Sequence, residues 1–142
     1  MRALLDVNVL IALLDPDHVH HAAAHAWLGR NIEAGWASCP LTQNGCIRIM
    51  AQRAYPGALP AASVAARLKA ATATPWHAFW PDSLSLLADD VLDWRGILGS
   101  RHVTDVYLLA LAVRNRGRLV TFDRGVPLAA VPHATGQHLV VI

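Results

Sequence analysis

Short apolar runs alternate along the chain with longer segments in which apolar residues recur at helical spacing. The runs have the length and composition of strands, and they stand at residues 1–5, 36–39, 76–80, 118–122 and 138–142. The segments between them predict helices at residues 7–14, 18–34, 40–50, 61–73, 83–93 and 104–115. Strands that alternate with helices indicate an α/β fold built on a central parallel sheet of four to five strands.

Three aspartates stand where this pattern changes from one element to the next. Asp6 ends the opening apolar run, Asp123 follows the run at 118–122, and Asp105 begins a nearly all-apolar helix. The carboxyl ends of parallel strands form the edge at which open α/β sheets bind ligands. We therefore expect Asp6, Asp105 and Asp123 to meet at one edge of the sheet.

Length and composition narrow the class of protein. The 142 residues, 54% of them hydrophobic, fit one domain, residues 1–142, with a sizeable core. Mean hydropathy is +0.33, but the longest apolar run, residues 106–113, is shorter than the roughly 20 residues of a membrane span. Asp6 interrupts the first apolar stretch, unlike a secretory signal. We expect a cytoplasmic protein without a membrane segment, in which Cys39 and Cys46 are core residues.

Charge is distributed unevenly, although the formal net charge is only +2. Between residues 94 and 124, six arginines stand against the two aspartates 105 and 123, a local net charge of +4. If a metal ion occupied these two acids, the surrounding surface would be strongly positive. Such a surface suits the phosphate backbone of a nucleic acid.

Three carboxylates at one edge repel one another unless a cation lies between them. Oxygen ligands without thiolates suit Mg²⁺ or Mn²⁺ rather than zinc. Such an ion can activate a water molecule and stabilise charge on a phosphodiester, so the acids and arginines together predict a metal-dependent nuclease. Taken singly, Asp105 could cap a helix and Asp123 could begin a turn. His21 and His25 share a helix face without a further ligand, which favours a structural role.

The stretches around the three acids resemble the acidic motifs of PIN-domain ribonucleases. They are residues 4–11, 102–112 and 119–125, and length and spacing resemble the VapC toxins of toxin–antitoxin pairs over essentially the whole chain. The resemblance implies an α/β/α sandwich and a Mg²⁺- or Mn²⁺-dependent endoribonuclease that inhibits growth by cutting RNA. It also implies neutralisation by a VapB antitoxin and a homodimer. Asp6, Asp105 and Asp123 match the family's metal ligands, and Thr121 matches the small polar residue before the last acid.

One position departs from the family pattern. The family usually has a glutamate where this chain reads residues 42–48, and no acid stands there. The missing glutamate falls at Gln43 or at Gly45, and the amide of Gln43 could still hold a metal-bound water. A weakened nuclease, or a PIN fold kept as a non-catalytic interaction module, is one alternative. Another is a haloacid-dehalogenase-like phosphatase, but its second acid would fall at Asn8, which cannot protonate a leaving group.

The apolar composition also suggests a protein partner. Trp27, Trp76 and Trp94 are tryptophans that we expect to be exposed. Apolar surface of this kind is usually covered by another chain.

Overall fold

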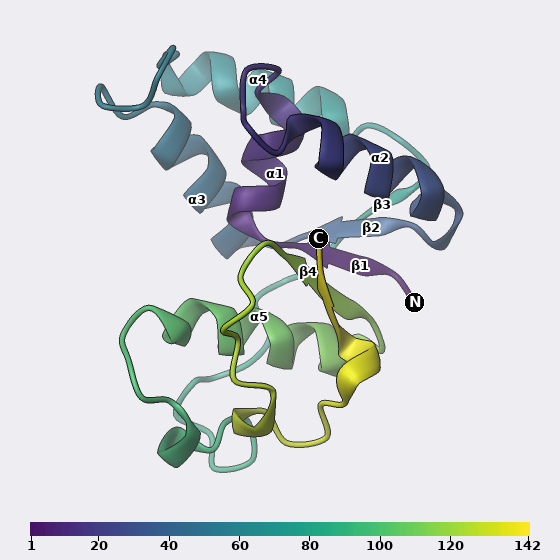
Figure 1. Ribbon diagram of the computed structural model, residues 1–142, viewed down its shortest axis with the longest axis vertical. Helices are drawn as coiled ribbons and strands as arrows, with labels where there is room; N and C mark the ends of the chain where they lie inside the picture. Colours follow the sequence, from purple (N-terminus) through teal and green to yellow (C-terminus); the bar gives the residue numbers. More distant parts are fainter.

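The computed structural model describes residues 1–142, and its centre is a five-stranded sheet in the order β3-β2-β1-β4-β5. The strands are β1 (Ala3–Leu5), β2 (Trp36–Ser38), β3 (His77–Phe79), β4 (Arg118–Thr121) and β5 (Leu139–Val141). Every neighbouring pair is parallel, with Leu4 opposite Ala37 on one side and Leu119 on the other. The prediction of a parallel α/β sheet is confirmed, with five strands (Figure 1).

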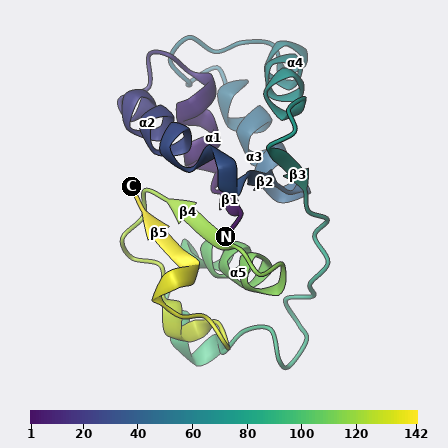
Figure 2. The same ribbon diagram turned by 90° about the vertical axis from the view of Figure 1, so that its right-hand side faces the viewer.

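Helices cover both faces of the sheet. They are α1 (Val7–Leu14), α2 (His21–Asn31), α3 (Pro40–Met50), α4 (Ala61–Thr72) and α5 (His102–Arg114). The first four lie on one face and α5 lies on the other (Figures 1 and 2). The result is the α/β/α sandwich that the resemblance implied. None of the helices combines the length and the apolar character needed to cross a membrane.

Successive side chains of the inner strands β1 and β4 point to opposite faces of the sheet, so the hydrophobic core has two parts. Leu4 and Leu119 pack with α5, whereas Leu5 and Val120 pack with α1 and its neighbours. Residues of parallel strands that are buried on both faces are apolar at successive positions, as are Leu4 and Leu5 of β1 and Leu119 and Val120 of β4. Helix α5 is buried from Val106 to Ala112 because the sheet covers one side and the irregular chain before and after it covers the other. The all-apolar character of α5 is therefore explained by burial between two layers.

Three expectations from the pattern are wrong in detail. Residues 83–93 form turns instead of a helix, and the hydroxyl of Ser85 accepts the N–H of Leu87 at 3.2 Å. The predicted helix 18–34 begins only at His21, because Nδ1 of His18 accepts the N–H of His20 in a turn, at 3.0 Å. Trp27 is buried, with the Arg118 guanidinium 5.1 Å from the centre of its ring.

Other expectations about single side chains are met. Trp76 and Trp94 are 41% and 47% exposed. Cys39 and Cys46 are buried, free thiols. These cysteines therefore serve as small core residues, as their number and spacing predicted.

Candidate active site

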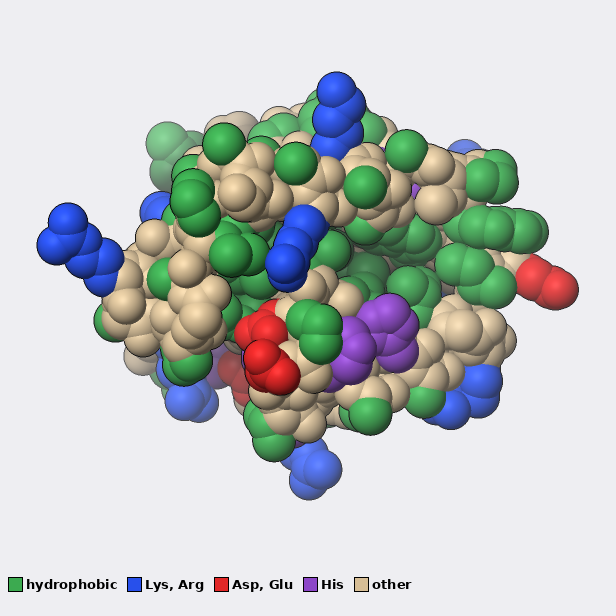
Figure 3. All heavy atoms as spheres, turned by 90° about the horizontal axis from the view of Figure 1, so that it is seen from above, with side chains coloured by type: hydrophobic (Ala, Val, Ile, Leu, Met, Phe, Trp, Pro, Cys, Tyr) green, Lys and Arg blue, Asp and Glu red, His purple; other side chains and the backbone are tan.

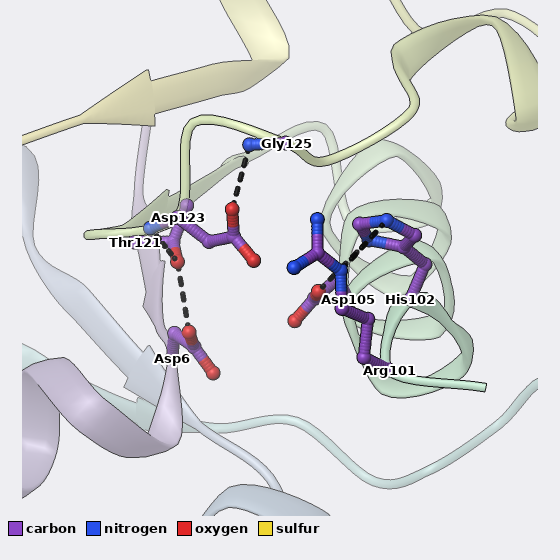
Figure 4. Close-up of polar contacts among 7 residues, drawn as sticks. All are labelled: Asp6, Arg101, His102, Asp105, Thr121, Asp123 and Gly125. Atoms are coloured by element: carbon purple, nitrogen blue, oxygen red, sulfur yellow. Dashed lines mark hydrogen bonds and ion pairs between the residues drawn. The ribbon is translucent and has the colours of Figure 1, made fainter. Parts of the chain in front are cut away.

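The three aspartates lie at the carboxyl end of the inner strands. Asp6 follows β1 and caps α1, because its Oδ1 accepts the N–H of Val7 at 2.6 Å. Asp105 stands in the first turn of α5, and Asp123 lies two residues beyond the end of β4. Their carboxylates face a common space, although they come from three separate elements (Figure 4). The structure thus brings together the three acids singled out in the sequence.

Thr121 connects two of these acids. Its hydroxyl donates to Oδ2 of Asp6 at 2.8 Å and accepts the N–H of Asp123 at 3.1 Å (Figure 4). The side chain is fully enclosed, with 1% of its surface exposed. A buried hydroxyl with both a donor and an acceptor role has a single orientation. Thr121 therefore fixes the position of the Asp6 carboxylate relative to the end of β4.

Asp123 is held by the loop that follows it. Its Oδ1 accepts the N–H of Gly125 at 2.6 Å. A Cβ at position 125 would lie 3.1 Å from that carboxylate oxygen and 3.4 Å from side-chain atoms of Arg101 and His102. A side chain at position 125 would therefore press on the Asp123 carboxylate, because the loop passes close to the acid and to the start of α5.

Burial and mutual repulsion act on the acids. Burial raises the pKa of Asp105, and the neighbouring charges of Asp6 and Asp123 raise it further. Burial likewise raises the pKa of Asp6, against hydrogen bonds from Thr121 and Val7 that lower it. Clustered carboxylates that disfavour one another's charge are stabilised by a cation among them. An all-oxygen set of three carboxylates fits a hard divalent ion such as Mg²⁺ or Mn²⁺.

His102 joins the cluster, and sequence reasoning gave it no role. Its Nδ1 lies 3.7 Å from Oδ2 of Asp105, and ligand atoms of His102, Asp105 and Asp123 lie within 4.8 Å of one another. Arg101 Nε donates to Nε2 of His102 at 3.2 Å, so Nε2 offers its lone pair and Nδ1 carries the proton. His102 therefore presents an N–H on the side of Asp105, at ion-pair distance but without a hydrogen bond, and this buried nitrogen has no other partner. The spacing of three residues on one helix was the available clue.

A cleft of about 240 Å³ opens beside the acids, between the starts of α1 and α5 and one side of α3. Asp6 and Asp105 line it together with Asn8. Helix α3 contributes Asn44 and Arg48, both of which are exposed. The cleft thus pairs two carboxylates with one guanidinium, an arrangement that can hold a cation and an anion side by side.

Gln43 points elsewhere. Its Nε2 donates to the hydroxyl of Ser38 at 2.9 Å, and that hydroxyl lies 2.8 Å from Nε2 of His77. Gly45 does line the cleft, but a Cβ there would lie 2.8 Å from Cγ2 of Val7. A glutamate at position 45 would therefore require Val7 to move.

The histidine pair His21 and His25 has a structural explanation. The rings lie 4.3 Å apart, and each bonds to a carbonyl oxygen at the end of α1, from Ala12 at 2.7 Å and Leu13 at 3.1 Å. Because a carbonyl oxygen only accepts, each ring donates an N–H. These contacts tie α2 to the last turn of α1.

Comparison with known proteins identifies the family. The PIN domain family model matches residues 3–132. The chain belongs to the PIN-domain family. Among curated relatives of this PIN domain, Ribonuclease VapC44 of Mycobacterium tuberculosis is 51% identical over 142 residues, all of both chains. Ribonuclease VapC39 of the same organism is 47% identical over 124 residues, 87% of this chain and 89% of the relative. Ribonuclease VapC38 is 46% identical over 125 residues, 87% and 86% of the two chains.

Proposed function

We propose that this PIN domain is a metal-dependent endoribonuclease and the toxin of a VapBC-type toxin–antitoxin pair. The observation that carries the proposal is the meeting of Asp6, Asp105 and Asp123 at the carboxyl edge of a parallel sheet, in a chain of this family. The relatives named as VapC ribonucleases support it, since one of them aligns over its full length.

The proposed metal ligands are Asp6, Asp105 and Asp123, with Mg²⁺ or Mn²⁺ as the ion. A divalent ion in such a site supplies positive charge for the phosphodiester and an activated water. Thr121 keeps Asp6 in place, so it is a positioning residue in this proposal, and the ring of His102 stands beside Asp105 at 3.7 Å. Gln43, expected to hold a water at the metal, is bonded to Ser38 in this structure. Its part in the reaction stays a prediction.

Arginines beside the acids are proposed to hold the RNA backbone. Arg48 lines the acidic cleft from α3, and Arg101 is exposed at the start of α5. Guanidinium groups bind phosphate oxygens through paired N–H donors. With one arginine on each side of the acids, the strand would cross the cleft with its phosphate towards Asp6 and Asp105.

A protein partner is part of the proposal. Between α1, α2 and α4 lies an apolar hollow of about 220 Å³, seen as a recess between ridges when the molecule is viewed from above (Figure 3). Leu13, Leu28, Leu68 and Trp76 are among its lining residues. An exposed apolar recess supports a covering chain, which we propose to be a VapB-like antitoxin, with a second copy of this chain as a further partner. Light scattering after size-exclusion chromatography, with the protein alone and with a VapB-like antitoxin encoded beside it, tests both, and a strict monomer that also fails to bind the antitoxin would contradict them.

The alternatives gain less support. The phosphatase alternative needs an acid two positions after Asp6, but that position holds Asn8, which lines the cleft. The family model that matches this chain is that of the PIN domain and not that of a phosphatase. The non-catalytic interaction module shares the fold and family with the proposed enzyme. Only a cleavage measurement separates those two.

Incubation of the purified protein with single-stranded RNA, with Mg²⁺, with Mn²⁺ or with a chelator, tests the activity. We expect cleavage only with metal, and a loss by orders of magnitude in Asp123→Asn. Asp89→Asn, at an exposed position outside the cleft, should cut like the parent. Absence of metal-dependent cleavage in the parent would leave the interaction module as the better account.

A further inference from the structure

A second cavity adjoins the acidic cleft. It measures about 350 Å³ and lies between the first turns of α3 and α5 and the irregular segment after β3. Most of its wall is apolar and comes from Leu41, Leu84, Leu86, Val103 and Tyr107. Its polar groups are the carboxylate of Asp82 and the hydroxyls of Thr104 and Tyr107. An apolar cavity of this size with few polar groups has the character of a small-ligand site.

Two residues form a wall common to both cavities. Leu41 and Thr104 line the second cavity and also the cleft that contains Asp6 and Asp105. Thr104 directly precedes Asp105 in the first turn of α5. A polymer whose phosphate lies at the acids therefore has its neighbouring unit within reach of the second cavity.

We propose that this second cavity, here called the base pocket, binds one unpaired guanine base of the RNA next to the bond that is cut. The inference rests on the proposed ribonuclease function and adds a base preference to it. Single-stranded RNA is recognised through unstacked bases that enter apolar or aromatic surfaces and bond along their edges. The base pocket offers an apolar wall and, at Asp82, a charged acceptor for the edge of a base.

The ring of Tyr107 forms the inner part of the base pocket. Only 6% of this residue is exposed, so its neighbours hold the ring in place at the wall of the pocket. Burial, and then the nearby charge of Asp82, raises the pKa of Tyr107, in agreement with an Asp82 carboxylate that lies close to the ring. Stacking against an aromatic ring tolerates any base, so the choice of base must come from a polar group.

Asp82 is that polar group. Its Oδ2 accepts the N–H of Leu41, at the start of α3, at 3.2 Å, which fixes the direction of the carboxylate. An ionised carboxylate offers about four acceptor positions, so it can still accept two further hydrogen bonds. Guanine carries two adjacent donors, N1–H and the N2 amino group, on its Watson–Crick edge. Adenine, cytosine and uracil lack that pair, so a carboxylate favours guanine.

The first test varies the RNA and the acceptor together. Uridine-rich oligonucleotides that contain one guanosine, or one inosine in its place, are incubated with the parent, with Asp82→Asn and with Asp89→Asn, and the cleavage rates are compared. We expect the parent and Asp89→Asn to cut the guanosine RNA roughly tenfold faster than the inosine RNA, the scale of the one charged hydrogen bond that is lost with the N2 amino group. Asp82→Asn should cut both at similar rates, while its amide oxygen still accepts from Leu41. Equal rates for guanosine and inosine in the parent would overturn the proposal.

The second test blocks the pocket. Leu86 lines it, whereas its neighbour Leu87 is 86% exposed and lies outside it. Leu86→Trp should lower cleavage of the guanosine RNA by roughly tenfold and remove the guanosine preference, and Leu87→Trp should change neither. If Leu86→Trp instead leaves the preference intact and alters the oligomeric state seen by light scattering, the cavity belongs to a protein interface and the proposal is wrong.

Binding separates this proposal from the ribonuclease function. The fluorescence anisotropy of end-labelled guanosine and inosine RNAs is measured with Asp105→Asn, which is expected not to cut them. Tighter binding of the guanosine RNA, lost when Asp82→Asn is added, supports the base pocket even if the parent never cuts RNA. Equal binding of the two RNAs, with a parent that does cut, contradicts the base pocket and leaves the ribonuclease in place.

Discussion

The side chain of Gln43 belongs to a chain of hydrogen bonds that links α3 to two strands. Gln43 donates to the Ser38 hydroxyl, which in turn is hydrogen-bonded to Nε2 of His77 at 2.8 Å. Ser38 ends β2 and is fully buried, and His77 begins β3. This network fixes the start of α3 against the sheet, and it turns Gln43 away from the cleft that Asn44 enters.

The position of Asn44 predicts how the missing acid can be restored. Asn44→Asp adds a carboxylate to a cleft that already contains Asp6 and Asp105, so RNA cleavage should occur at a lower Mn²⁺ concentration. Gln43→Glu is the matched comparison and should shift the metal requirement less, because Ser38 engages that side chain. Titration of cleavage against Mn²⁺ measures both. A larger shift in Gln43→Glu would show that residue 43 reaches the metal, as the sequence suggested.

His77 gives the stability of the fold a pH dependence. Burial, and then the charge of Arg2, lowers the pKa of His77 in the folded chain. The unfolded chain, with a histidine pKa of about 6.5, then takes up the proton first as the pH falls. The contribution of His77 is complete above about pH 6.5 and is lost as the pH falls through the lower folded value.

Chemical denaturation at several pH values tests this prediction. The free energy of unfolding of the parent should decrease on acidification below about pH 6.5 more steeply than that of His77→Gln. His133→Gln, at an exposed position, should keep the slope of the parent. Equal slopes in the parent and His77→Gln would show that burial and the charge of Arg2 do not lower the pKa of His77.

At the scale of elements, the turn between α5 and β4 decides how two acids meet. Asp105 stands at the start of α5 and Asp123 stands just after β4, so the angle between these elements sets their separation. Gly117 forms the turn. A Cβ at position 117 would lie 2.5 Å from Cη2 of Trp80 and 2.6 Å from the carbonyl oxygen of Arg2. The backbone of Arg2 belongs to the chain leading into β1, so it cannot give way freely.

Gly117→Ala should therefore lower the free energy of unfolding by about 1–3 kcal/mol, the cost of forcing extra volume into a packed site. Gly29→Ala is the control, because Gly29 lies within α2 with no heavy atom within 4 Å of its would-be Cβ. That change should raise stability by about 0.5–1 kcal/mol through helix propensity. Urea denaturation measures both, and a neutral Gly117→Ala would mean that β1 and Trp80 adjust without cost.

Elements with a local pattern could be predicted from the sequence. Helix α1 has the predicted bounds, since an N-cap acid and the turn at Asp15 mark both ends. Residues 83–93 could not be predicted, because Leu84, Val91 and Leu92 occur at helix-like intervals but pack in the core beside α5 from successive turns. Serines and aspartates that bond to nearby backbone favour turns over a helix in that segment. Tertiary contact with α5, which no local pattern records, decided the outcome.

The candidate site likewise has one part that could be predicted from the sequence and one part that could not. The meeting of Asp6, Asp105 and Asp123 could be predicted, because strand ends and helix starts share one edge of a parallel sheet. The residues that hold these acids in position could not be predicted from the sequence. The hydroxyl of Thr121 reaches Asp6 across 115 positions of sequence, and Gln43 finds Ser38 rather than the acids. Side-chain direction depends on such partners, which only the assembled fold supplies.

On the scale of the whole molecule, two apolar layers hold three acids close together at the edge between them. The cores on the two faces of the sheet contain 13 and 16 buried residues, and the acids lie at the sheet edge that both layers share. Two carboxylates about 5 Å apart repel by roughly 3 kcal/mol at an effective dielectric constant near 20. The fold therefore carries an unfavourable electrostatic term that a bound cation would relieve.

The most direct test of this account is a thermal melt of the parent and Asp105→Asn, with and without Mn²⁺, beside an RNA cleavage assay. Without metal, Asp105→Asn should be as stable as the parent or more stable, because one repelling charge is gone. With Mn²⁺ at a hundred times its dissociation constant, the parent should gain about 2.7 kcal/mol, and the variant much less. Cleavage should fall by orders of magnitude in the variant. If Asp105→Asn cuts RNA at the parental rate, or if Mn²⁺ leaves the melting temperature of the parent unchanged, the acids do not form a catalytic metal site.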